Sequence, residues 1–68
     1  MKYNMHNRIE MYDLLVLGAT EKQIETYSNS DPLTIYQVGE NLYQMSGIVD
    51  YLTDADGLLE MLDELSGE

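Results

Sequence analysis

The residues of this sequence with the clearest chemical potential are carboxylates close to its C-terminal end. Five of them follow at short spacing: Asp54, Asp56, Glu60, Asp63 and Glu64. Carboxylates gathered in this way serve as acid–base pairs, as ligands of divalent cations, or as a negative surface for a basic partner. The surrounding sequence favours the third use over the other two.

A metal site is not expected, although the stretch TDADG at residues 53–57 superficially resembles a calcium-binding loop. Its acidic spacing does not match the pattern D-x-[DN]-x-[DN]-G followed by a more distant glutamate. The chain has no cysteine, and its one histidine, His6, cannot form a zinc site alone. Thr53 fits instead as the N-cap of a helix whose first turn holds Asp54 and Asp56. We therefore expect neither a metal nor a cofactor.

Catalytic chemistry has little support in the sequence. His6 lies close to Glu10 and Asp13, but a lone histidine near a chain end is usually just solvated. The serines have no second histidine that could activate them as nucleophiles. A chain of 68 residues also has little room to enclose a substrate. We expect the protein not to be an enzyme.

Net charge is the most informative property of the sequence. It is −10, from 13 acidic and 3 basic residues, and the 46 residues after Lys22 contain ten acidic side chains and no basic one. Binding to nucleic-acid phosphates or to anionic membranes depends on Lys and Arg, so we expect neither. A basic protein partner is favoured instead, in both encounter rate and orientation.

The acidic side chains of the last expected helix share one side of it, away from its leucines. This side holds Asp56, Glu60, Asp63 and Glu64. Residues four apart on a helix lie about 6 Å from each other, a distance comparable with the spacing of phosphates along one DNA strand. Such a row fits the phosphate-binding sites of a nucleic-acid-handling enzyme. The alternative is an ordinary solvated helix face that serves solubility.

Tyrosines near the expected hairpin are a second candidate feature. Tyrosine is enriched in interfaces because it buries a large area at low entropic cost and keeps a polar tip. We take Tyr43 and Tyr51 as candidate anchors for a partner. The alternative is that they complete a small core that lacks Phe and Trp.

Two helices are expected in the first part of the chain. The first covers residues 6–17, ends at Gly18 and turns one apolar face to the core. This face holds Met5, Ile9, Tyr12 and Val16. A short buried strand over residues 13–17 stays open as the alternative. The second helix covers residues 20–27, with Thr20 and Gln23 at the spacing of a capping box and with Ile24 and Tyr27 facing the core.

After a loop at residues 28–32, the pattern predicts a hairpin and a final helix. Residues 33–45 have the alternating pattern of a β-hairpin with its turn at Gly39-Glu40-Asn41. Glycine and asparagine tolerate positive φ, which suits a tight turn. Residues 48–52 fit a third strand or a helical turn. Residues 53–65 are expected to form an amphipathic helix, which Gly57 destabilises by roughly 1 kcal/mol relative to alanine. The fold class is therefore α+β: two N-terminal helices, a β-hairpin or short antiparallel meander, and a C-terminal amphipathic helix. An all-α fold is the alternative.

The length of the chain sets the scale of the molecule. We expect one domain over residues 1–68, with a core so small that self-association into a homodimer stays open as a source of stability. No apolar run approaches the ~20 residues of a membrane span. The first residues lack the apolar stretch of a signal peptide, so we expect a cytoplasmic protein.

Short, acidic, cysteine-free and tyrosine-bearing, the chain is similar in profile to small inhibitors encoded by bacteriophages and mobile elements, including anti-CRISPR and other DNA-mimic proteins. This likeness extends over the whole chain, contains no shared motif and assigns no residues. It implies a small inhibitor that occludes a basic, nucleic-acid-binding surface. Two alternatives stay open: an accessory or regulatory subunit that binds through apolar surface, and a helix-turn-helix-like regulator with its recognition helix over residues 31–42.

Overall fold

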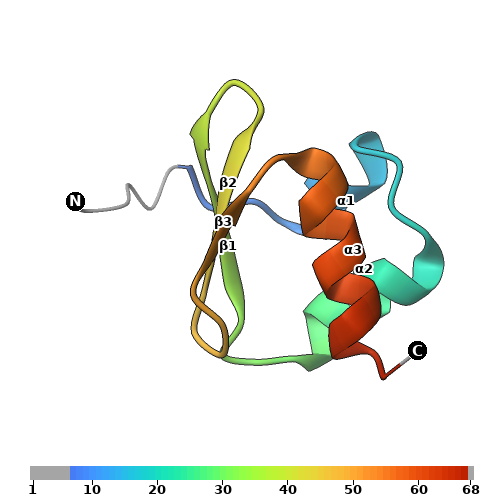
Figure 1. Cartoon of the computed structure of the whole chain (residues 1–68). Helices are drawn as coiled ribbons and strands as arrows, with labels where there is room; N and C mark the ends of the chain where they lie inside the picture. The colour runs from blue at the N-terminus through green and yellow to red at the C-terminus, as the bar shows by residue number, and fades with distance from the viewer. Residues whose placement is uncertain (1–6, 68) are drawn as a thin grey trace.

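The structure is a two-layer α+β fold, as the sequence predicts. A computed structural model describes residues 7–67, and within this range the chain forms three helices and one antiparallel sheet of three strands in the order β1-β2-β3. The elements are α1 (Met11–Val16), α2 (Glu21–Asn29), β1 (Thr34–Gly39), β2 (Leu42–Ser46), β3 (Tyr51–Thr53) and α3 (Ala55–Leu65). Figure 1 shows the sheet on one side and the helices together on the other.

The core lies between these two layers. Ile35 on β1 and Met45 on β2 are paired across the sheet and fully buried, so their face is the one that packs on the helices. In residues 7–67 the buried apolar side chains are Ile9, Leu14, Ala19, Tyr27, Leu33, Ile35, Tyr43, Met45, Leu58 and Leu62. None of the helices in this range has the length and apolar character that a membrane crossing requires.

Residues 8–10 run beside β1 rather than in a helix, which corrects the bounds of the helix predicted over residues 6–17. Arg8 forms a bridge to Tyr36 on the outer side of β1, and the Ile9 amide donates a hydrogen bond of 2.9 Å to the Ile35 carbonyl. The Tyr27 hydroxyl donates to the Ile9 carbonyl at 2.8 Å. Both backbone groups of Ile9 therefore bond to residues distant in sequence rather than to helical neighbours, while its side chain lies in the core.

Helix α1 is short and begins at Met11. Glu10 and Asp13 form its capping box, in which the Glu10 amide donates to Asp13 Oδ2 at 2.8 Å. Leu14 is its one buried residue. Gly18 follows with a φ of +94°, a left-handed conformation that suits glycine after a helix end and confirms its predicted role. The predicted core positions Tyr12 and Val16 are exposed, and Met5 and His6 lie outside the described residues.

Helix α2 begins where the capping box predicts. The Gln23 amide donates to Thr20 Oγ1 at 3.2 Å, and the Thr20 amide donates to Gln23 Oε1 at 2.7 Å. The helix runs two residues further than predicted, to Asn29, so the loop before β1 starts at Ser30 rather than at residue 28. Residues 31–42 contain β1 and its turn, so the second helix of a helix-turn-helix is not formed.

The hairpin is confirmed, but its turn works differently from the prediction. Gly39 pairs with Leu42, and neither Glu40 nor Asn41 between them has a positive φ. Asn41 is used for its side chain instead, because its Oδ1 accepts a hydrogen bond from the Ala55 amide at 3.3 Å. This bond ties the hairpin tip to the start of α3. Of the two alternatives for residues 48–52, a third strand is formed, but it is β3 at Tyr51–Thr53, and residues 48–50 belong to the loop before it.

Helix α3 is capped by Asp54 rather than by Thr53, which ends β3. Asp54 Oδ1 accepts a hydrogen bond from the Gly57 amide at 2.9 Å. A Cβ atom at Gly57 would collide with Thr53 Oγ1. Glycine at this position therefore allows the strand-to-helix corner to close tightly, which offsets its poor helix propensity.

Candidate protein-binding surfaces

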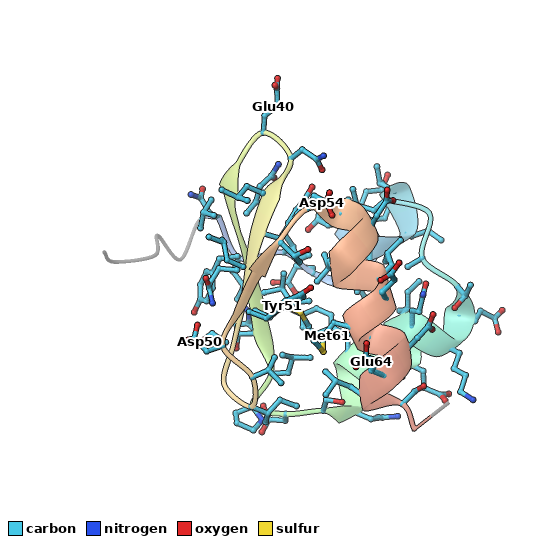
Figure 2. The ribbon with its side chains drawn as sticks, viewed as in Figure 1. Glu40, Asp50, Tyr51, Asp54, Met61 and Glu64 are labelled. Carbon is cyan, nitrogen blue, oxygen red and sulfur yellow. The ribbon has the colours of Figure 1, made fainter. Side chains whose placement is uncertain are left out.

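Every acidic side chain of the described residues is exposed to solvent. They are Glu10, Asp13, Glu21, Glu25, Asp31, Glu40, Asp50, Asp54, Asp56, Glu60, Asp63 and Glu64. Figure 2 shows their spread: Glu40 stands at the hairpin tip, Asp50 lies on the side of the sheet away from the helices, and Glu64 lies on α3. Negative charge is therefore spread over much of the molecule, and it is densest where carboxylates share one element.

The densest group is the acidic face of α3, formed by Asp56, Glu60, Asp63 and Glu64. All four are exposed, whereas the opposite side of the helix buries Leu58 and Leu62 against the sheet. The structure therefore confirms that this helix has an acidic side and an opposite apolar side, as predicted. On one helix face, side chains three and four positions apart lie about 5–6 Å from each other, so each carboxylate has another nearby.

Asp54 belongs to the same helix but has a second task. Its side chain caps the helix through the Gly57 amide, and a cap of this kind is worth about 1 kcal/mol. Asp56 lies in the first turn, where the helix dipole favours negative charge. Glu60, Asp63 and Glu64 have neither reason to be acidic, and the last two lie near the helix end that favours cations.

The two candidate tyrosines are placed very differently. Tyr43 is 5% exposed and belongs to the core, so it has almost no surface to offer a partner. Tyr51 is 38% exposed. It pairs with Met45, so it lies on the helix-facing side of edge strand β3, and Figure 2 shows it directed towards α3. Only Tyr51 can contribute to a surface that includes α3.

A second surface, the apolar face of α1, was not expected from the sequence. It is formed by Met11, Tyr12, Leu15 and Val16, whose exposed fractions are 48%, 72%, 58% and 69%. These residues lie at i, i+1, i+4 and i+5, so they adjoin one another on one side of a helix. Four large apolar side chains in a six-residue helix therefore face solvent together.

Hollows border α1 on both sides. A groove of about 700 Å³ between α1 and α2 is lined by Met11 and Ile24, together with Glu21, Lys22 and Glu25 and the polar end of α2. A smaller hollow of about 270 Å³ lies between α1 and the sheet, with Asp13, Val16 and Arg8 among its lining residues. Both are shallow features of the surface, suited to protruding side chains of a partner.

The buried polar side chains of the described part of the chain are all satisfied internally. No buried side-chain nitrogen or oxygen lacks a hydrogen-bond partner, and no group of three or more His, Cys, Asp or Glu could hold a metal ion. Burial raises the pKa of Tyr27, whose hydroxyl is already engaged with the Ile9 carbonyl.

Comparison of the chain with models of protein families, with curated proteins and with solved structures found no match. Functional conclusions therefore depend on the surfaces that the chain itself presents.

Proposed function

We propose that the protein is a small acidic inhibitor that binds a basic, nucleic-acid-binding surface of a partner protein through the acidic face of α3. The observation that carries this proposal is the arrangement of Asp56, Glu60, Asp63 and Glu64 on one exposed helix side, with no cationic side chain among them. A basic partner surface would gain from these charges in both encounter rate and orientation.

The cost of this arrangement to the free protein supports a functional reason for it. Like charges at i, i+4, such as Glu60 and Glu64, destabilise a helix by about 0.2–0.5 kcal/mol per pair. None of the three described helices has a basic residue in its last turn, where a cation would be favourable. Selection for stability alone would not produce this pattern, whereas selection for a cationic target would.

The spacing of the carboxylates favours a partner that normally holds phosphates. Side chains at successive turns of α3 repeat at about 5–6 Å, which resembles the repeat of phosphates along a nucleic-acid strand. Arg and Lys side chains that bind phosphates bind carboxylates by the same charge-assisted hydrogen bonds. Occupation of such a site by α3 would exclude the nucleic acid, so the protein would act by competition.

The test is charge reversal on α3 against matched reversal elsewhere. The variant Glu60→Lys with Asp63→Lys changes the acidic face of α3, and Asp31→Lys with Glu40→Lys gives the same net charge away from it. Asp54 is left intact because it caps the helix. Each tagged protein is used to capture partners from nuclease-treated lysate of its natural host at low and at high salt, with detection by mass spectrometry.

The expected result is a nucleic-acid-handling protein retained at low salt by the wild type and by the control variant, but not by the α3 variant. The captured protein should then lose duplex DNA or RNA when the wild type is added, and salt should weaken the complex. Equal capture by all three proteins, or capture that survives high salt, would contradict the proposal. Circular dichroism of each variant verifies that the fold is kept.

A further inference from the structure

The apolar face of α1 requires an explanation separate from that of α3. A helix on the surface of a small domain usually turns its apolar side to the core. Here Leu14 alone is buried, while Met11, Tyr12, Leu15 and Val16 face outward. Single exposed apolar residues are common, but a contiguous group on a monomer typically marks a binding site.

The residues that surround this face are mainly acidic, and their charge indicates which kind of partner would bind there. The groove between α1 and α2 is rimmed by Glu21 and Glu25, with Lys22 between them in sequence. A third hollow lies beside Met11 and is lined by Glu10, Asp31 and Arg8. Across the three hollows that border α1, carboxylates outnumber cationic side chains by five to two. They are Glu10, Asp13, Glu21, Glu25 and Asp31 against Arg8 and Lys22. An apolar centre with a negative rim favours a ligand with apolar side chains flanked by Lys or Arg.

We propose that the apolar face of α1, together with the α1–α2 groove, is the docking site for a basic amphipathic helix of a partner protein. The apolar side of that helix covers Tyr12, Leu15 and Val16, and an apolar side chain enters the groove beside Met11 and Ile24. Its Lys and Arg residues reach the exposed carboxylates of Glu21 and Glu25. Helix-in-groove recognition of this type uses anchors at i, i+3, i+4 and i+7.

A second copy of the same chain fits this site less well. Each molecule has a net charge of −10, and the acidic rim of one α1 face would lie against the acidic rim of the other. Like charges facing each other across an interface disfavour association, whereas a basic helix neutralises the rim as it covers the apolar centre. The charge at this surface therefore selects a basic partner over self-association.

The experiment uses a defined probe and reports where it binds. The probe is a synthetic two-heptad peptide of Leu and Lys with helical periodicity, and the control peptide has Glu in place of Lys. Each is titrated into the ¹⁵N-labelled full-length protein while amide chemical shifts are recorded. The expected result is saturable shifts of residues 11–16 and 21–29 with the Lys peptide and none with the Glu peptide. Shifts confined to residues 55–65, or none at all, would overturn the proposal.

Paired variants separate docking from general attraction between opposite charges. Tyr12→Gln with Leu15→Gln removes two exposed apolar side chains from α1, and Ile48→Gln with Leu52→Gln removes two other exposed apolar side chains, from β3 and the loop before it. We expect the α1 variant to bind the Lys peptide at least about tenfold more weakly than the wild type does. The variant of Ile48 and Leu52 should bind it with wild-type affinity. Equal affinity of all three would overturn the proposal. So would a dimer in sedimentation of the free wild type that the α1 variant abolishes.

Discussion

Gln23 shows how one side chain can join two elements. Its Oε1 accepts from the Thr20 amide to complete the cap of α2, while its Nε2 donates to the Leu59 carbonyl of α3 at 3.1 Å. Glutamate would serve the cap equally well but could not donate to Leu59. In a chain this rich in acids, the amide at this buried position is explained by the need for a donor.

Tyr27 joins α2 to the N-terminal segment in a similar way. Its hydroxyl donates to the Ile9 carbonyl at 2.8 Å, and its ring lies in the core. Replacement of Tyr27 by Phe leaves that carbonyl without its partner, so we expect the free energy of unfolding at neutral pH to fall by about 1–3 kcal/mol. Chemical denaturation of both proteins measures the difference.

The difference should also depend on pH in one direction. Burial raises the pKa of Tyr27 in the folded protein above its ordinary value of 10.0. Above pH 10 the unfolded chain therefore releases the phenolic proton first, which stabilises the unfolded state and lowers the stability of the wild type. Since Phe does not titrate, the gap between wild type and Tyr27→Phe should narrow above pH 10. A gap that stays constant or widens would contradict this assignment.

At the scale of elements, helix α3 has a well-stabilised N-terminal end, whereas repulsion between carboxylates disfavours the rest of its exposed side. Asp54 and Gly57 close the corner after β3, and Asp56 suits the dipole at this end. Glu60 then has carboxylates on three sides, at Asp56, Asp63 and Glu64. The helix is held by Leu58 and Leu62 in the core rather than by interactions along its surface.

Neutralising the centre of this face should therefore stabilise the free protein. With three like-charge neighbours at about 0.2–0.5 kcal/mol each, Glu60→Gln should raise the free energy of unfolding by up to about 1.5 kcal/mol at low salt. The gain should shrink at high salt because exposed charges are screened. Glu40→Gln at the hairpin tip is the matched control, and urea denaturation of both reports the effect. A loss of stability in Glu60→Gln, or an equal gain in both variants, would contradict it.

The elements that the sequence predicted well are those whose signals are local. The Thr20–Gln23 box, the alternation around residues 39–41 and the spacing of leucines in α3 each depend on residues close in sequence. The helix predicted over residues 6–17 forms only at Met11–Val16, because Ile9 finds its hydrogen-bond partners on Ile35 and Tyr27, which are distant in sequence. Periodicity alone does not detect such pairing.

The same distinction separates the two candidate surfaces. The acidic face of α3 follows from charge and helical spacing, both of which are readable in the sequence. The apolar face of α1 could not be predicted, because Tyr12 and Val16 have the spacing of core residues and only the packing of α1 shows that they face outward. Tyr43 is the opposite case: its residue type suggested an interface residue, but its position in β2 places it in the core.

At the scale of the whole molecule, net charge acts across the entire structure. The Cα atoms extend over 32 × 23 × 17 Å. At 0.01 M ionic strength the Debye length is about 30 Å, so every carboxylate influences every other one; at 1 M it is about 3 Å. With a net charge of −10, self-repulsion is the dominant long-range electrostatic effect in the free protein.

Salt should therefore stabilise the free protein. We expect the midpoint of thermal unfolding to rise between about 0.01 M and 1 M NaCl, by roughly 4–8 °C for each kcal/mol of repulsion that is screened. Calorimetry at a series of NaCl concentrations measures the change, and KCl is the control for effects specific to the ion. A midpoint that falls with salt would mean that attractive ion pairs outweigh the repulsion.

The position of Ile9 has a consequence for how the molecule bears mechanical load. Its amide is held by β1 and its carbonyl by α2, so the same residue is attached to both layers. A force applied from the N-terminal side is divided at Ile9 between the sheet and the helices. Ile9 therefore cannot leave β1 without also breaking its hydrogen bond with Tyr27. Under tension from this side, we expect the sheet and α2 to resist together at Ile9.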